Sequence, residues 1–265
     1  MKPFWSRILV TALGLPLVLG LVYLGGWWLF ALVAAAGLLA LHELYAMTRA
    51  LRPVAIAGFA GLLAIMFGLR LGGLEWATGG VAATLALSLL LKGVADTRQS
   101  ATVSVGTTVL GASWIGFGLG YVLLVRGISE HGRLAAYALL LAMFAGDTAA
   151  YFVGMVVGRH KLAPTISPGK TWEGFVAGTA ATIFVAWIAL YHTGFLPNGR
   201  SLVLGLAIAL AGPIGDLFES ALKRDMNVKD TGRLLAGHGG VLDRVDSLLF
   251  ASVAAFYVIA GFGAA

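Results

Sequence analysis

The chain has 265 residues, of which 59% are hydrophobic and only 11% are charged, and its mean hydropathy is +0.91. An average soluble domain is about 25% charged, so this composition excludes a soluble globular protein and predicts an all-α, polytopic integral membrane protein. The absence of cysteine excludes disulfides and thiolate metal sites. The net charge of +6 is better explained by cationic loops facing an anionic lipid leaflet than by binding to nucleic acid.

Nine apolar runs approach the roughly 20 residues that a helix needs to cross a bilayer. In chain order they cover residues 8–25, 27–47, 54–69, 74–91, 103–125, 134–157, 174–191, 202–222 and 247–262. The first run follows Lys2 and Arg7 as in a signal peptide, but no clear cleavage site follows it, so we interpret it as a retained span. We expect an N-terminal region over residues 1–132 with spans one to five, and a C-terminal region over residues 133–265 with spans six to nine.

Lysine and arginine are distributed unevenly between the two sets of loops that nine spans define. With the N-terminus inside, only four of the 18 basic residues fall in outside segments, which leaves 14 inside. The four are Arg70, Arg126, Arg133 and Arg200. Because basic loops stay on the cytoplasmic side, this bias predicts a cytoplasmic N-terminus and a C-terminus across the inner membrane.

Charged side chains gather at the end of the eighth run. Four polar residues recur there at positions i, i+3, i+4 and i+7, which places them on one stripe of a helix: Asp216, Glu219, Ser220 and Lys223. Charged groups beside hydrocarbon are costly, so such a stripe indicates a functional site. The alternative is a helix end whose charges neutralise one another, but Asp216 lies too deep for its carboxylate simply to reach water.

A second pair of carboxylates, Asp243 and Asp246, opens the ninth run with i, i+3 spacing. Both would share a face near a helix N-terminus, where the dipole favours anions. Two carboxylates on one face repel unless a cation lies between them, and Mg²⁺ prefers one or two carboxylates together with phosphate oxygens. Helix capping is the alternative. The glycines of the preceding G-H-G-G sequence, residues 237–240, would let backbone N–H groups approach a phosphate.

A carboxylate also occurs inside the sixth run. Asp147 and Tyr151 have i, i+4 spacing, and about 11 residues separate Asp147 from Arg159, or roughly 16 Å of helix. An unpaired carboxylate at this depth is costly, so we expect it to face a water-filled or protein-lined cavity. A buried, hydrogen-bonded structural aspartate is the alternative.

The loop after the sixth run contains two prolines and several polar residues, which exclude a continuous helix. Its S-P-G-K-T sequence, residues 167–171, lacks the glycine spacing of a nucleotide-binding P-loop and does not follow a strand, so an ATPase is excluded. Lys170 is nevertheless a candidate phosphate contact. A further charged pair, His42 and Glu43, lies near the cytoplasmic end of the second run, where a functional and a structural role are both open.

The C-terminal residues resemble a known family. Residues 220–246 read S-x-L-K-R-x4-K-D-x-G-x2-L-x-x-H-G-G-V-x-D-R-V-D, which is similar to the motif of phosphatidate cytidylyltransferases, the CDP-diacylglycerol synthases. The upstream elements D-x3-Y-x2-G and S-P-x-K-T-x-E-G also resemble that family. One position departs from it: Ala236 stands where the family usually has proline or glycine.

The resemblance implies transfer of a cytidylyl group from CTP to phosphatidate, which gives CDP-diacylglycerol and pyrophosphate. It implies Mg²⁺, and a second cation is a further candidate, with Asp216, Asp243 and Asp246 as metal ligands. The implied catalytic residues are these three carboxylates with Lys223, Arg224 and Arg244. The implied substrate-binding residues are Asp147, Ser167, Lys170, Lys229, Asp230, His238, Gly239 and Gly240.

The partners implied are CTP, phosphatidate and the lipid bilayer, with a homodimer as one candidate assembly. Two other functions stay open at this stage. A transporter of an anionic solute would suit a basic vestibule with an intramembrane carboxylate, although no paired broken helices are seen. A CTP-dependent lipid kinase would transfer a phosphoryl group and release CDP.

Overall fold

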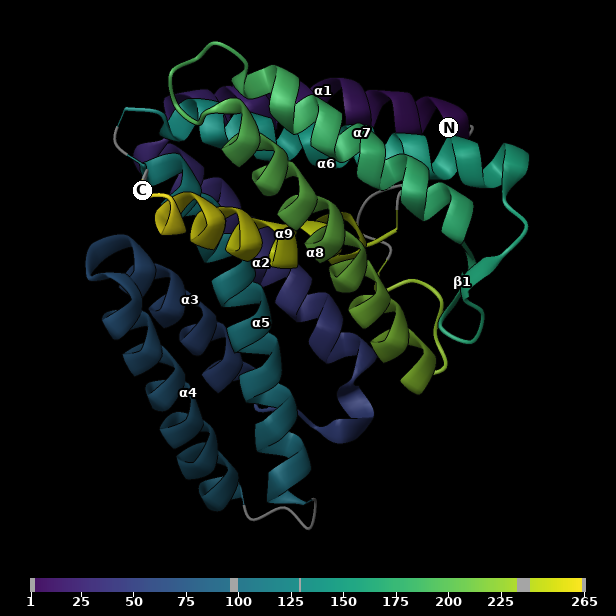
Figure 1. Cartoon of the computed structure of the whole chain (residues 1–265). Helices are drawn as coiled ribbons and strands as arrows, with labels where there is room; N and C mark the ends of the chain where they lie inside the picture. The colour runs from purple at the N-terminus through teal and green to yellow at the C-terminus, as the bar shows by residue number, and fades with distance from the viewer. Residues whose placement is uncertain (1–2, 96–99, 129, 233–238, 264–265) are drawn as a thin grey trace. The chain divides into compact units, whose positions relative to one another are not determined.

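The computed structural model describes residues 3–95, 100–128, 130–232 and 239–263. Within these residues the chain is almost entirely helical (Figure 1). The helices are α1 (Pro3–Leu24), α2 (Gly26–Met47), α3 (Ala55–Leu71), α4 (Gly73–Ala95), α5 (Ala101–Gly127), α6 (Gly132–Val157), α7 (Trp172–Leu190), α8 (Asn198–Asp225) and α9 (Leu242–Gly261), with a short 3₁₀ helix at Arg49–Leu51.

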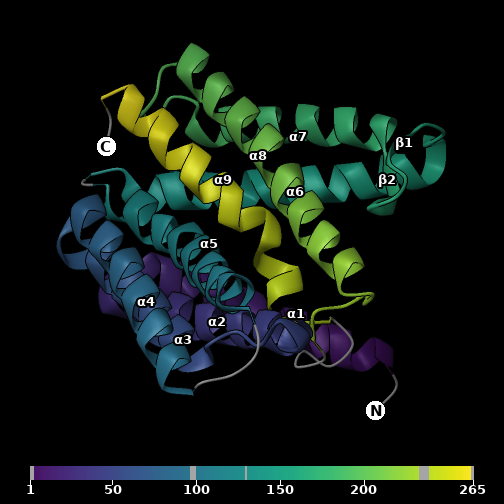
Figure 2. The same ribbon diagram turned by 90° about the horizontal axis from the view of Figure 1, so that it is seen from below.

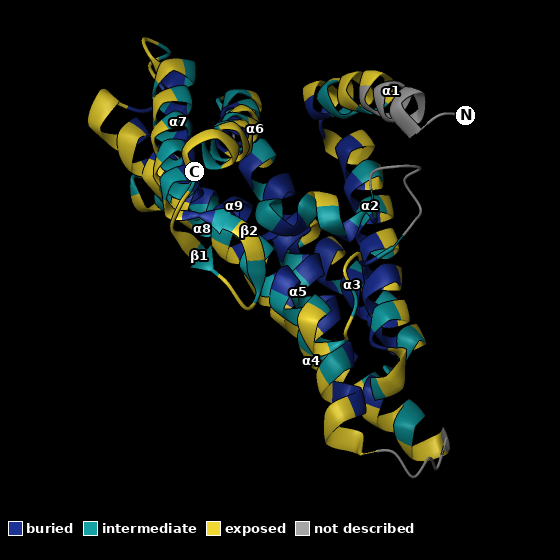
Figure 3. Cartoon of the chain, turned by 90° about the vertical axis from the view of Figure 1, so that its right-hand side faces the viewer, coloured by how far each residue is buried: buried dark blue, intermediate teal, exposed yellow. Residues whose placement is uncertain are grey.

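Each predicted apolar run coincides with one of these helices, which confirms the all-α, polytopic membrane fold. Seven of them, α2 and α4–α9, are long and apolar enough to cross a bilayer. The apolar part of α1, Ala12–Leu24, and α3 are shorter, so the count of nine spans is approximate. Large exposed apolar side chains such as Trp28, Phe152 and Val176 suit contact with lipid, and exposed residues recur along the helices in Figure 3.

The chain divides into two compact units. One comprises residues 1–124 with 226–245, and the other comprises residues 125–225 with 246–265. Each unit therefore combines segments that are far apart in the sequence. The predicted division into residues 1–132 and 133–265 is a division of the sequence and stays a prediction.

In the first unit, α3 and α4 form a helical hairpin (Figure 1). Its core contains Ile65, Leu69 and Ala77, all buried. Helix α2 is tied to α5 by a buried hydrogen bond in which the Tyr45 hydroxyl donates to the Thr108 carbonyl at 2.8 Å. These contacts fix the C-terminal half of α2, the part of the helix that carries Glu43.

In the second unit, α6 and α7 lie side by side in both views (Figures 1 and 2). Small residues at four-residue intervals line the contact: Gly146, Ala150 and Gly154 on α6, and Gly174, Gly178 and Thr182 on α7. A Cβ atom on Gly178 would lie 2.9 Å from both the Ala150 Cβ and the Gly146 carbonyl oxygen. Small residues at this spacing let two membrane helices approach closely.

This contact predicts that Gly178→Val destabilises the protein by about 1–3 kcal/mol, because the added side chain meets backbone that cannot move aside. The measurement is the unfolding temperature of the purified protein in detergent. Gly199→Val is the matched control, since a Cβ atom at Gly199 has no neighbour within 4 Å. Equal unfolding temperatures for both variants would contradict close packing of α6 against α7.

The loop between α6 and α7 forms a small antiparallel hairpin that the sequence did not predict. Strand β1 (Lys161–Ala163) pairs with β2 (Ser167–Thr171), with Lys161 opposite Thr171 and Ala163 opposite Ser167. Thr171 then caps α7, because its hydroxyl accepts a hydrogen bond from the Gly174 N–H at 3.1 Å. A side-chain oxygen at this position satisfies a free amide of the first helical turn. The last residue of the hairpin therefore also fixes the start of α7.

Candidate active site

The polar stripe predicted for the eighth run lies on the last turns of α8. The Ser220 hydroxyl donates to the Asp216 carboxylate at 3.2 Å, and the Lys223 ammonium lies 2.6 Å from the Glu219 carboxylate. Gly215, beside this stripe, allows α9 to come close, because a Cβ atom there would collide with the Asp246 carbonyl oxygen. The stripe on α8 therefore faces the start of the α9 segment in the second unit.

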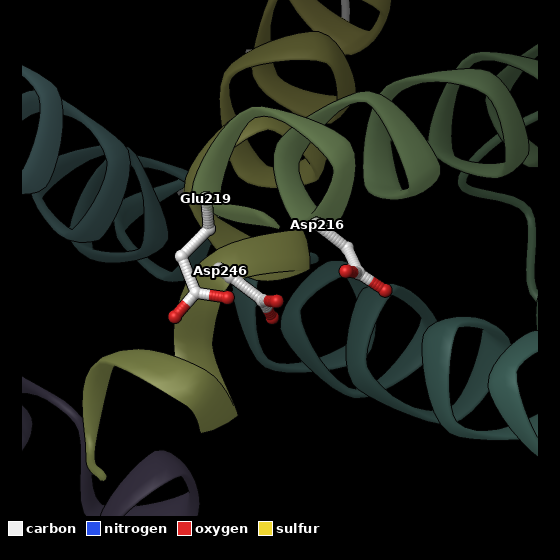
Figure 4. Close-up of side chains that lie close together, drawn as sticks. All are labelled: Asp216, Glu219 and Asp246. Carbon is white, nitrogen blue, oxygen red and sulfur yellow. The ribbon is translucent and has the colours of Figure 1, made fainter. Parts of the chain in front are cut away.

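Three carboxylates meet at this contact (Figure 4). Asp216 and Glu219 come from α8 and Asp246 comes from α9, and each offers an oxygen within 4.8 Å of the others. The Glu219 side chain is only 1% exposed, and Asp246 is 9% exposed. Like charges this close and this buried repel strongly, so the cluster is stable only with cations or protons nearby.

Two lysines supply part of that positive charge. Lys170 Nζ lies 2.7 Å from an Asp216 oxygen, and Lys223 Nζ lies 2.6 Å from a Glu219 oxygen. Three carboxylates and two lysines leave a formal charge of −1 when all are ionised. Carboxylate oxygens are the ligands that Mg²⁺ and Ca²⁺ prefer, so the donor set fits a hard divalent cation.

The hairpin brings Lys170 to the cluster. Lys170 lies on β2, and the Arg224 guanidinium Nε donates to the Ile166 carbonyl at 3.1 Å, which ties the hairpin to the end of α8. At its other side, the Glu173 carboxylate accepts from the His160 backbone N–H at 3.2 Å and contacts the His160 ring at 2.7 Å. Both ends of the hairpin are thus fixed, which explains how a loop lysine reaches a carboxylate on α8.

The carboxylate inside α6 lines a small cavity of about 50 Å³. Asp147 shares this cavity with Thr179 and Thr182 of α7, Pro213 of α8 and Ser247 of α9. The volume is sufficient for a water molecule with polar partners. Although it lines this cavity, Asp147 is an exposed residue in the structure, and its role in substrate binding stays a prediction.

The remaining predicted residues belong to the first unit. Lys229 and Asp230 are exposed, and Gly239 has a positive φ of 79°. Asp243, in the first turn of α9, accepts hydrogen bonds from the N–H groups of Gly240 at 2.8 Å and Thr231 at 3.3 Å. Two of the positions singled out from the sequence, His238 and Ala236, lie outside the described residues.

The structure thus gathers Asp216, Lys170, Lys223 and Asp246 in one cluster, with Arg224 at its edge and Ser167 on the same hairpin. It adds Glu219, which the sequence placed on the stripe without assigning it to a metal. Its i+3 spacing from Asp216 is the signal that could have identified it. Asp243 is not one of the three clustered carboxylates, and its role as a metal ligand stays a prediction. The catalytic role of Arg244 and the substrate-binding roles of Lys229 and Asp230 also stay predictions.

Carboxylates and lysines clustered among membrane helices suit binding of a divalent cation together with anionic, phosphate-bearing groups. The fold and the cluster therefore indicate a membrane protein that acts on phosphate-bearing molecules. The sequence model of the cytidylyltransferase family matches residues 5–262. The chain belongs to this family.

Curated relatives match along nearly the whole chain. A phosphatidate cytidylyltransferase of Bacillus subtilis (strain 168) is 36% identical over 97% of this chain and 98% of its own length. The enzyme of the same name from Staphylococcus haemolyticus is 32% identical over 92% of this chain and 94% of its own. A third, from Mycobacterium tuberculosis (strain ATCC 25618 / H37Rv), is 34% identical over 94% of this chain and 79% of its own. Membership of the family that the sequence motif suggested is confirmed.

Proposed function

We propose that this protein transfers a cytidylyl group from CTP to phosphatidate, forming CDP-diacylglycerol and pyrophosphate for phospholipid synthesis. Three relatives with the name phosphatidate cytidylyltransferase, at 32–36% identity over more than nine-tenths of the chain, support this activity. The single structural observation that carries it is the cluster of Asp216, Glu219 and Asp246 with two lysines. Such a cluster suits a reaction between two polyanions.

The proposed reaction is an in-line displacement at phosphorus. A phosphate oxygen of phosphatidate forms a bond to the α-phosphorus of CTP, while the bond from that phosphorus to the oxygen bridging the α- and β-phosphates breaks, and pyrophosphate leaves. The attacking phosphate monoester has a second pKa of about 6, so it is largely ionised near neutral pH and needs no strong base. The protein must instead neutralise charge and align the two substrates.

The carboxylate cluster is the proposed metal site. Asp216, Glu219 and Asp246 offer three oxygens close enough to share one ion, and Mg²⁺ would keep further positions for phosphate oxygens. When bound, a divalent cation here would neutralise phosphate oxygens and stabilise the departing pyrophosphate. Asp243, the further ligand expected from the sequence, and a second cation are retained as proposals of the same kind.

The lysines are proposed to serve two sets of anions. Lys170 and Lys223 pair with carboxylates in the structure, and each can turn to a substrate phosphate once a divalent cation offsets the carboxylate charge. Arg224, at the edge of the cluster, is proposed as a further phosphate ligand, and Ser167 as a hydrogen-bond donor from the same hairpin. In the other unit, Lys229, Arg244 and the amide of Gly239 are candidates for binding substrate phosphates, whereas the N–H of Gly240, also expected from the sequence, is already donated to Asp243.

We place the protein in the inner membrane of a bacterium, since the relatives are bacterial and seven helices are long enough to span a bilayer. The 14-to-4 bias of basic residues supports a cytoplasmic N-terminus and active site and a C-terminus on the opposite side. A cytoplasmic site would meet CTP directly, while the acyl chains of phosphatidate stay in the bilayer. Pairing of two copies stays a prediction.

The placement of Lys170 gives a testable prediction. Glu173→Ala removes the contacts to His160 that fix one end of the hairpin, so Lys170 should be held less firmly. We expect the KM for CTP or phosphatidate to rise about three- to tenfold with little change in kcat, as for lost uniform binding. The control is Glu130→Ala, at an exposed position outside the hairpin. An unchanged KM for both substrates would contradict this role of the hairpin.

The proposed function is tested by following two labels. Purified protein is incubated with phosphatidate, Mg²⁺ and CTP that carries ³²P at either the α- or the γ-phosphate. We expect the α-label in a lipid-soluble product and the γ-label in pyrophosphate. Transfer of the γ-label to lipid would instead indicate a CTP-dependent lipid kinase, and no transfer of either label would contradict an enzymatic role.

A further inference from the structure

Glu43 is a buried carboxylate that the proposed chemistry does not use. It lies in α2, only 2% exposed, between the fully buried side chain of Leu41 and the buried side chain of Leu44. An ionisable group in an apolar helix is costly unless it has defined partners. The partners of Glu43 therefore indicate what the residue does.

Those partners lie near the other end of the chain, in the segment of residues 226–245 that belongs to the same unit. The backbone N–H of Leu242 donates to Glu43 Oε2 at 2.9 Å, and the Thr231 hydroxyl donates to the same oxygen at 3.5 Å. Leu242 is the first residue of α9, so its N–H is one of the amides that have no partner within the helix. Glu43 thus caps α9 from a different helix.

Backbone packs against this carboxylate from two sides. A Cβ atom on Gly232 or on Gly240 would collide with the carboxylate oxygens of Glu43. Only glycine lets the backbone approach so closely at both points. The side chain of Glu43 consequently lies between the two ends of the segment that runs from Thr231 to Leu242.

Asp243 holds the same two ends by a second set of bonds. Its carboxylate accepts from the N–H of Gly240 at 2.8 Å and from the N–H of Thr231 at 3.3 and 3.4 Å. Two acidic side chains, one local and one 199 residues away from Leu242, therefore determine where Gly239 and Gly240 lie at the start of α9. Arg244 follows directly in the sequence.

We infer that Glu43 is a positioning residue: by accepting hydrogen bonds from Leu242 and Thr231, it fixes the first turn of α9, which carries Asp243 and Arg244. The inference rests on the proposed cytidylyl transfer, in which Asp243 and Arg244 are candidate site residues. Glu43 would act through this turn and not by touching a substrate. A carboxylate that served stability alone would affect unfolding without a specific effect on this segment.

Three substitutions separate these roles. Glu43→Ala removes the acceptor, whereas Glu43→Gln keeps one acceptor oxygen of similar reach and replaces the other oxygen and the charge with an NH₂ group. Tyr45→Phe is the matched control, because it removes another buried hydrogen bond of α2, to Thr108 of α5. Should Glu43→Ala fail to fold, Thr231→Val removes one donor to Glu43 at nearly constant shape.

The first measurement is hydrogen exchange of the amides of Thr231, Gly240 and Leu242 in the purified protein without substrates. We expect exchange to be at least about tenfold faster in Glu43→Ala, faster to a smaller extent in Thr231→Val, and unchanged in Tyr45→Phe and Glu43→Gln. Unchanged exchange in Glu43→Ala, or in Thr231→Val where the alanine variant does not fold, would overturn the inference.

The second measurement is the rate of cytidylyl transfer as a function of CTP concentration. We expect kcat/KM to fall at least about tenfold in Glu43→Ala and to stay within about threefold of wild type in Glu43→Gln. Equal losses in the alanine and glutamine variants, or a loss in Tyr45→Phe as large as that in Glu43→Ala, would contradict positioning. Failure of the proposed function would appear differently, as wild-type protein without activity but with the same exchange pattern.

Discussion

Asp246→Asn is expected to lower the kcat of cytidylyl transfer by at least about a hundredfold, the scale of losing a group that stabilises charge in a transition state. Asparagine keeps the shape of the side chain and removes its charge. Asp246 is buried, and its carboxylate lies within 4.8 Å of those of Asp216 and Glu219. The substitution therefore weakens the proposed metal site without creating a cavity.

The same substitution relieves repulsion among three clustered carboxylates, so the unfolding temperature should stay equal or rise. Loss of activity with retained stability is the result that separates a chemical role from a structural one. Asp225→Asn is the control, since Asp225 is exposed at the end of α8. A rate within about threefold of wild type for Asp246→Asn would contradict the assignment of Asp246 to the proposed metal site.

Lys223→Met is expected to destabilise the protein by about 3–5 kcal/mol, because it leaves the charge of Glu219 buried without its closest cation. The Glu219 side chain is 1% exposed, Lys223 is 11% exposed, and their charged atoms are 2.6 Å apart. Solvent therefore provides little compensation. Unfolding temperature and denaturant midpoint in detergent measure the loss.

The double variant Lys223→Met with Glu219→Gln should recover most of that stability, since position 219 no longer carries a buried charge that has lost its closest cation. It should not recover activity, because both the cation and a carboxylate of the proposed metal site are gone. Lys161→Met, at an exposed position on β1, should change stability by no more than about 0.5 kcal/mol. A double variant as unstable as Lys223→Met would show that the unpaired charge of Glu219 is not the cause of the lost stability.

Local sequence signals identified the helices and part of the carboxylate cluster that forms the candidate site. Long apolar runs predict spanning helices because a bilayer imposes their length, and each predicted run is helical in the structure. Likewise, helical spacing along one segment brought Asp216, Glu219 and Lys223 onto one stripe before their contacts were known. Residues that are close together in the sequence determine both the spanning helices and the polar stripe.

Other features depend on contacts between distant segments, and the sequence carried little signal for them. The hairpin at residues 161–171 consists of strands of three and five residues, the second of which contains proline and glycine, and both are too short to show a periodic pattern. The ion pair of Lys170 with Asp216 follows from that hairpin. The bond between Glu43 and Leu242 joins residues 199 positions apart, and no local pattern indicates such a pairing.

The most direct test of the central claim is the rate of CDP-diacylglycerol formation against Mg²⁺ concentration, in wild type and in Asp216→Asn, Glu219→Gln and Asp246→Asn. The claim predicts saturable dependence on Mg²⁺ in wild type. In each variant it predicts a lower maximal rate and a higher Mg²⁺ midpoint, because the cation and the substrate phosphates share the site. Wild-type rates and unchanged midpoints in the three variants would show that these carboxylates are structural and would contradict the account.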